Sequence, residues 1–278
     1  NTAVGRGALD ANTTATANTA LGSSTLPANT TGASNTAVGH SALEANTTAS
    51  NNTAVGKNAL VANTTGAGGV AVGMNCLSAN TTGAENTAVG LSALLLNTTG
   101  TQNVAFGSSA LDACTTGSFN TGIGTSALGA VTTSDYNTAV GRNAGTAITT
   151  GTQNTFVGGL AGDATDDGTN NVAVGFEALS ANCGSGNTAI GTRAGKVTTA
   201  DNNTLVGLNA GTAVTTGADN VAVGANALDA NTTASENTAV GVSSLSTNTT
   251  GAENVAVGYS TLSNSTTASY NTAVGKSS

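Results

Sequence analysis

One 17-residue pattern repeats along the chain, and this periodicity limits the fold more strongly than any other feature of the sequence. The consensus unit reads Asn-Thr-Ala-Val-Gly-x-x-Ala-Leu-x-Ala-Asn-Thr-Thr-Gly-x-x, numbered below as positions 1 to 17. Fourteen units have 17 residues, two have 16, and eight residues remain. The units begin at Asn1, Asn18, Asn35, Asn52, Gly69, Asn86, Asn103, Asn120, Asn137, Asn154, Asn171, Asn187, Asn203, Asn220, Asn237, Asn254 and Asn271. Units this short bury little surface alone, so they must stack on one another.

The composition also favours stacking over a globular core. Only 7% of the 278 residues are charged and 3% aromatic, with 38 glycines, one proline and no tryptophan. Large side chains are too few for a globular interior, while the strict period argues against disorder. We predict an all-β fold, a parallel β-solenoid or β-roll of about 16.5 coils with 17 residues per coil. Residues 1–278 are expected to form a single repetitive segment, an interior piece of a longer chain.

The residue types at each position predict which side chains face the interior. Position 4 is always aliphatic or phenylalanine, as in Val4 and Phe106, and position 2 is threonine or valine. Because side chains alternate along a strand, these two positions share a face, and we predict that this face points inward. Position 9 is usually leucine, as in Leu9 and Leu43, and is predicted to enter the same core. Position 5 is glycine in every unit, which indicates a corner with positive φ.

Four units carry glycine instead of leucine at position 9. In three of them an aliphatic residue follows within the same coil, at Ile148, Val197 or Val214, and is predicted to fill the vacated interior slot. The fourth unit, with Gly162 followed by Thr165, has no such replacement.

The polar positions are predicted to form ladders. Thr-Thr occupies positions 13 and 14 in fourteen of sixteen full units, and asparagine recurs at positions 1 and 12. Identical side chains repeating every 4.8 Å or so along an axis can hydrogen-bond to their copies. Position 6 varies widely, from Arg6 and His40 to Met74 and Tyr259, so it should face solvent and carry any recognition of a surface receptor or glycan.

Charge and hydropathy exclude two classes of partner. The net charge is −8 with only six Lys and Arg, which disfavours nucleic acid and anionic membranes. No stretch approaches 18 consecutive apolar residues, so we expect no membrane insertion. The first residues already belong to the repeat, and export or anchoring segments are therefore expected outside this sequence.

The Asn-Thr-Ala-Val-Gly and Asn-Val-Ala-Val-Gly segments resemble the Ser-Val-Ala-Ile-Gly-type repeats of trimeric autotransporter adhesin heads. The longer unit, for example residues 35–51, is also similar to repeats upstream of intramolecular-chaperone domains in phage-tail-fibre-like surface proteins. The resemblance covers the whole chain. It implies a parallel β-roll shared among three chains on a cell surface or a virion-like fibre.

Few residues are candidates for chemistry. Cys76, Cys114 and Cys183 lie at least two coils apart, roughly 10 Å, which is beyond disulfide reach within the chain. Cys76 is interpreted as a buried apolar thiol, whereas pairing of Cys114 or Cys183 between chains stays open. His40, the only histidine, has no nucleophile or carboxylate pattern near it and is interpreted as solvated.

One acidic cluster interrupts the repeat. It consists of Asp163, Asp166, Asp167 and Gly168 and replaces Thr-Thr. Its spacing matches neither an EF-hand nor the Gly-Gly-x-Gly-x-Asp roll, so a solvated turn is favoured over a metal site. We therefore assign no catalytic, cofactor-binding or metal-binding residue and expect no cofactor.

Asn-Thr-Thr is also an acceptor sequence for N-glycosylation. It occurs at Asn12, Asn29, Asn46, Asn63, Asn80, Asn97, Asn231 and Asn248. A ladder explains these asparagines without modification, and the aliphatic residues at the same position in other units favour an inward-facing side chain.

These observations favour a non-catalytic extracellular fibre shaft, surface adhesin or tail-fibre-like filament over two other functions. Ice binding through the threonine rows is the alternative, although adjacent threonines in a strand point to opposite sides. A polysaccharide-processing enzyme would need basic residues clustered beside carboxylates. The six basic residues are scattered along the sequence, at Arg6, Lys57, Arg142, Arg193, Lys196 and Lys276. Each coil offers about two large apolar groups, so we expect a homotrimer or a laterally supported filament.

Overall fold

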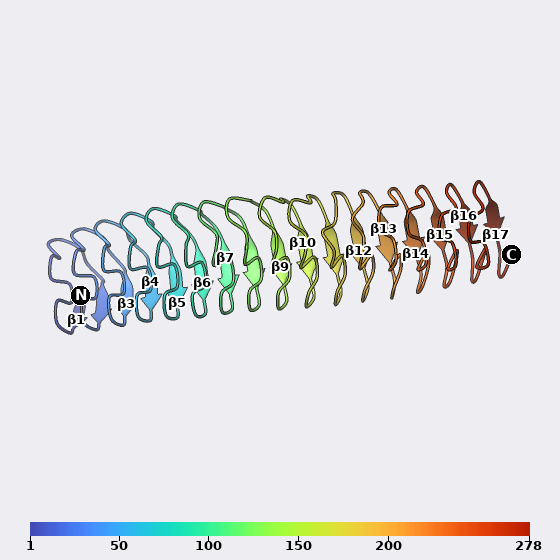
Figure 1. Cartoon of the computed structure of the whole chain (residues 1–278). Coiled ribbons are helices and arrows are strands. Elements are labelled where there is room, and N and C mark those ends of the chain that lie inside the picture. The colour runs from blue at the N-terminus through green and yellow to red at the C-terminus, as the bar shows by residue number, and fades with distance from the viewer. The chain divides into compact units, whose positions relative to one another are not determined.

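The computed structural model describes residues 1–278 and contains one three-residue β-strand per repeat and no helix (Figure 1). No segment forms a helix that could cross a membrane. The chain divides into two compact units, Asn1–Asn137 with the first eight strands and Thr138–Ser278 with the other nine. The strands are β1 Thr2–Val4, β2 Thr19–Leu21, β3 Thr36–Val38, β4 Thr53–Val55, β5 Val70–Val72, β6 Thr87–Val89, β7 Val104–Phe106, β8 Thr121–Ile123, β9 Thr138–Val140, β10 Thr155–Val157, β11 Val172–Val174, β12 Thr188–Ile190, β13 Thr204–Val206, β14 Val221–Val223, β15 Thr238–Val240, β16 Val255–Val257 and β17 Thr272–Val274.

Within each unit, every strand pairs in parallel with the strand of the next coil. In residues 1–137, β1 pairs with β2 so that Thr2 lies beside Thr19 and Val4 beside Leu21. In residues 138–278, β14 pairs with β15 in the same register, position for position. The two 16-residue coils keep this register, because β11 still pairs with β12 and β12 with β13. The prediction of a parallel β-solenoid built from 17-residue coils is confirmed.

The prediction that positions 2 and 4 point inward is wrong. The strands bury their middle residue, and Ala37, Ala71 and Ala239 have no exposed surface. Val4 and Phe106, at position 4, are each 56% exposed. The reason is the width of the coil. A Cβ atom added at Gly122, a position-3 glycine, would lie 3.3 Å from Cγ of the leucine of the preceding coil, Leu111, so only a small side chain fits beneath the leucines.

The inward placement of position 9 is confirmed, since every leucine at this position is buried except Leu9 and Leu262 near the two ends. Leu43, Leu60 and Leu77 are almost completely buried, and each has a positive φ near 50°. This left-handed backbone is unusual for leucine and costs roughly 1–2 kcal/mol in isolation. The burial of a complete leucine side chain, worth about 1.5–3 kcal/mol, offsets that cost.

The interior slot is refilled differently from the sequence prediction. Ile148 and Val214 are fully buried, as predicted, but Val197 is 39% exposed and Thr198 takes the slot in that coil. The coil with Gly162 does have a replacement, Phe156, which enters from position 3. A Cβ atom at Gly162 would lie 2.4 Å from the Phe156 ring, so the ring occupies the space of the missing leucine.

Leu205, also at position 3, fills the same space beside two glycines. A Cβ atom would lie 2.7 Å from Leu205 at Gly195 and 2.6 Å from it at Gly211. The roles of Phe156 and Leu205 are not predicted from the sequence, because the sequence analysis places positions 2 and 4 inside and therefore position 3 on the outer face.

The glycine at position 5 is a corner, as predicted. Gly73 has φ +135°, and a Cβ atom there would lie 2.4 Å from the carbonyl oxygen of Gly90 in the next coil. Both the backbone angle and the close approach of two coils therefore exclude a side chain.

The ladders are confirmed at positions 1, 12 and 13, where the bonds reach the backbone as well as other side chains, but the threonines at position 14 form no ladder. At position 1, the Asn18 Oδ1 accepts a hydrogen bond from the backbone N–H of Asn35 at 2.9 Å. At position 12, the Asn46 Nδ2 donates to Asn29 Oδ1 at 2.8 Å. At position 13, the Thr81 hydroxyl donates to the carbonyl of the equivalent threonine, Thr98, at 3.0 Å. Neighbouring coils are thus tied together by buried polar groups that nearly all have partners; the exception in the position-12 ladder is Asn97 Oδ1, where the next coil carries Cys114.

Candidate functional site

In each unit, the outer face of the strands is the surface that differs most from an ordinary protein exterior. Positions 2 and 4 of all seventeen strands carry only threonine, valine, leucine, isoleucine or phenylalanine, without one charged residue. The most apolar part lies on β7 and β8, where Val104, Phe106 and Ile123 are 37%, 56% and 37% exposed. Monomeric proteins rarely expose continuous apolar surface of this kind.

The threonines on this face keep their hydroxyl groups free. Thr36, Thr87 and Thr238, at position 2, form no side-chain hydrogen bond within the chain. The threonines at position 13 differ, because their hydroxyls donate to the adjacent coil, as in Thr232 to Thr249. The exposed threonines at position 14, such as Thr82, also form no side-chain hydrogen bond, so the rows at positions 2 and 14 are both available to an external partner or to water.

The two edges of the face carry opposite charge. Position 6 follows the strand, is exposed as predicted, and has no acidic residue; its charged groups are Arg6, Lys57, Arg142 and Lys276. Positions 16 and 17 precede the next strand and have no basic residue; their acidic groups are Glu85, Asp135, Asp201, Asp219, Glu236 and Glu253. Each unit therefore presents an uncharged face between a basic and an acidic edge.

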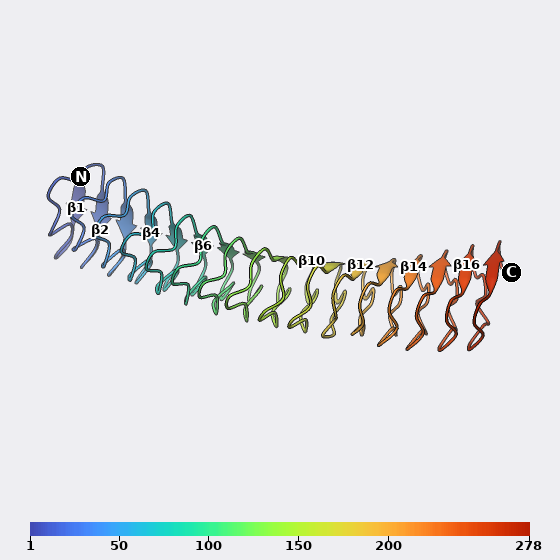
Figure 2. The ribbon, with the colours of Figure 1, turned by 90° about the horizontal axis from the view of Figure 1, so that it is seen from above.

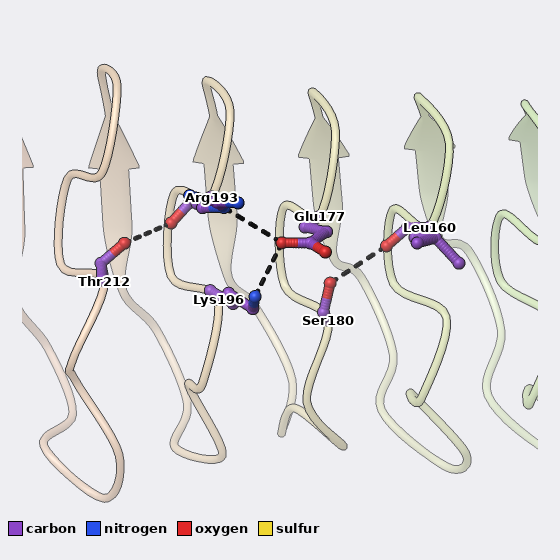
Figure 3. Close-up of polar contacts among 6 residues, drawn as sticks. All are labelled: Leu160, Glu177, Ser180, Arg193, Lys196 and Thr212. Carbon is purple, nitrogen blue, oxygen red and sulfur yellow. Dashed lines mark hydrogen bonds and ion pairs between the residues drawn. The ribbon is translucent and has the colours of Figure 1, made fainter.

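An ion-pair cluster lies on the coil surface beside β11 and β12 (Figure 3). The Glu177 carboxylate accepts from Lys196 Nζ at 2.7 Å and from Arg193 Nε at 3.1 Å. The Lys196 hydrogen bond is the main reason why the pKa of Glu177 lies below its ordinary value, with Arg193 adding to it. The bonds join one coil to the next, and the side chains of Ser180 and Thr212 each donate to a backbone carbonyl of the preceding coil in the same way. The cluster therefore links adjacent coils and stabilises their stacking.

Sequence reasoning missed this cluster and interpreted the acidic residues differently. Glu177 and Arg193 are 16 residues apart, one short coil, so comparing charges between adjacent coils would have paired them. Asp163 lies near this cluster, and burial raises its pKa above the ordinary value. Asp166 instead accepts a hydrogen bond from Thr149 in the preceding coil. The stretch from Asp163 to Gly168 is therefore split between two surroundings.

The cysteines are all free and buried. The thiol of Cys76 donates to backbone carbonyls, in agreement with an interior thiol. Burial raises the pKa of Cys114 to about 11, and burial likewise raises the pKa of Cys183, which lies beside the Thr165 hydroxyl. Thiols so protonated and covered are poor nucleophiles, and neither is placed to reach another chain.

The remaining predicted residues have structural surroundings. His40 is exposed, and its Nδ1 lies 3.0 Å from the Ser41 hydroxyl. Of the eight Asn-Thr-Thr asparagines, all except Asn12 are buried. In Asn63 the amide nitrogen donates to Asn46 Oδ1 and to the Gly66 carbonyl, so attachment of a glycan would break the ladder.

Comparison with protein-family models, with curated proteins and with solved structures gives no significant match.

Proposed function

We propose that this chain is a non-catalytic structural segment of an extracellular fibre, a shaft of the kind that serves a surface adhesin or a tail-fibre-like filament. The observation that carries the proposal is the use of nearly every internal polar group to tie one coil to the next. The asparagine ladder at position 1 runs through consecutive coils, for example from Asn220 to Asn237 and on to Asn254. The widest variation is at outward positions, above all position 6.

Self-association is part of this proposal, as a homotrimer or a laterally supported filament. Each interior slot holds alanine and one larger group, while the valines at position 4 lie outside. A chain that leaves its second apolar row in solvent gains more from association than one that buries both rows. A receptor or glycan would meet the variable side chains at position 6.

The location of the protein on its source cells or particles tests the proposed function directly. Antibodies raised against the folded chain, used for immunogold electron microscopy of the source cells or particles, should label fibres on the outer surface. Gold confined to the cell interior would contradict the proposal. Turnover of a polysaccharide by the folded chain, abolished by Glu177→Gln, would instead favour an enzyme built on the one cluster of carboxylates and cations.

Ice binding is the second candidate, with a different row of threonines. In the Thr-Thr pair only the position-13 hydroxyls are bonded, whereas the partly exposed threonines at position 2 and the exposed threonines at position 14 are unbonded. Against this function, Phe106 protrudes from the face in residues 1–137, and the strands of residues 138–278 turn progressively along the stack (Figure 2). A thermal-hysteresis measurement decides: activity that Thr204→Lys removes would favour ice binding, and no activity would eliminate it.

A further inference from the structure

We infer that the outer strand faces of the two units are where copies of this chain pack together, with the stacks running in the same direction. The inference deepens the proposed function, because it rests on the self-association proposed there and names the surface and the orientation.

The chemistry of this face favours a second copy of the chain as its binding partner. Positions 2 and 4 carry no charged side chain on any strand. The cores of protein interfaces are likewise depleted in charge and enriched in large apolar groups. Phe106, flanked by Val104 and Ile123, is the exposed aromatic group of the kind that anchors such interfaces. A nucleic acid or an anionic membrane would need a basic face, which this is not.

The area of the face agrees with a second copy. A three-residue strand is about 10 Å long and coils repeat every 4.8 Å or so, which gives each unit a face of roughly 400 Å². Two such faces together bury about 800 Å², below the roughly 1,200 Å² of a stable interface. Engagement of both units brings the total to about 1,600 Å², the standard size. Both units are therefore expected to contribute.

The charged edges set the direction. Rotation of one copy about an axis parallel to the stack brings position 6, which has no acidic residue and four basic ones, against the acidic edge at positions 16 and 17 of the other copy. Antiparallel packing would bring like edges together. In residues 138–278 it would place the acidic row of Asp219, Glu236 and Glu253 against another acidic edge. Like charges facing each other oppose association and thereby fix orientation.

The test uses the full chain and a matched pair of variants. Val206→Lys/Val240→Lys places two charges on the face, and Leu208→Lys/Val242→Lys places the same charges on the same coils at position 6. Sedimentation equilibrium at micromolar concentration should give a multiple of 26.3 kDa for the wild type. The face variant should associate at least about tenfold more weakly, and the position-6 variant no more weakly than wild type. Phe106→Ala, which removes bulk from an exposed site and leaves the core intact, should also weaken association.

The outcomes separate the two proposals. A monomeric wild type would overturn self-association itself. An oligomer that the position-6 variant disrupts and the face variant does not would leave self-association standing and overturn the assignment of the face.

A separate measurement tests whether the two copies pack in parallel. Energy transfer between fluorophores attached through Ser278→Cys should be strong in the wild-type oligomer, because the native cysteines are buried and parallel packing brings the labelled coils together. Antiparallel packing separates the labels by eight coils or more, about 40 Å. Weak transfer in an oligomer that the face variant dissociates would overturn the parallel arrangement.

Discussion

Phe156 fills the interior space left by the missing leucine at Gly162, and this predicts both the direction and the size of changes in the free energy of unfolding. Phe156 is fully buried and fills the space that leucine occupies in the consensus coil. Phe156→Ala should therefore lower the free energy of unfolding by about 3–5 kcal/mol. Gly162→Leu should also destabilise, by roughly 1–3 kcal/mol, because its Cβ alone would lie 2.4 Å from the ring.

The double variant should be far more stable than the sum of these effects. Phe156→Ala/Gly162→Leu recreates the alanine and leucine of the consensus coil, so its loss is expected to be under about 2 kcal/mol, with a coupling of at least about 3 kcal/mol. Denaturant unfolding followed by circular dichroism measures all four proteins. Gly211→Leu is the matched control, since its new side chain meets Leu205 and not Phe156 and should give no rescue. Additive losses in the double variant would refute the shared slot.

Three further predictions follow from the corners, the ladders and the buried carboxylates. Gly73→Ala should destabilise by about 2–4 kcal/mol, whereas Gly7→Ala, where no atom lies within 4 Å, should cost about 1 kcal/mol for its backbone angle; thermal unfolding compares them. Asn63→Ala removes the hydrogen bonds that connect it to both neighbouring coils and should cost about 2–4 kcal/mol in denaturant unfolding, while a loss below about 0.5 kcal/mol would argue against the ladder. Burial raises the pKa of Asp229, so the folded state holds this proton more tightly than the unfolded chain, and the stabilisation present below the unfolded pKa is lost as pH rises through the folded pKa. Asp229→Asn should therefore raise the melting temperature at pH 7 and leave it nearly unchanged near pH 3; a lower melting temperature at pH 7 would contradict this sign.

The periodicity is sufficient to predict the architecture. It predicts the register, the glycine corner and the asparagine ladders, because stacking makes one residue face the same surroundings in every coil. It also places Leu43 and its equivalents inside, since a leucine that recurs at one fixed position of so polar a sequence indicates a buried side chain.

The sequence could not decide which face of a three-residue strand points inward. Alternation leaves two choices, and the larger side chains, Val4 and its equivalents, suggested the wrong one. The width of the coil decides, and it depends on how leucines from successive coils fill the interior. The roles of Phe156 and Leu205 were hidden by the same error, because both seemed to lie on the outer face.

The candidate site was only partly accessible from the sequence. The variable, exposed position 6 was predicted correctly, but the uncharged face was hidden by its assignment to the core. The acidic edge at positions 16 and 17 could have been found by comparing charges position by position. The pairing of Glu177 with Arg193 and Lys196 required the distance between coils as well as the repeat length.

Lysine substitution at two adjacent residues tests the central claim, that coils stack with position 3 inside and position 4 outside. Ala239 is fully buried and Val240 is partly exposed on the same strand. Circular dichroism during heating should show that Val240→Lys keeps its β-structure. Its unfolding should remain cooperative, with a melting temperature near that of the wild type in the same association state. Ala239→Lys should be unfolded or severely destabilised, because an unpaired charge has no place beneath the leucines. The reverse result, with Ala239→Lys tolerated and Val240→Lys unfolded, would contradict the account.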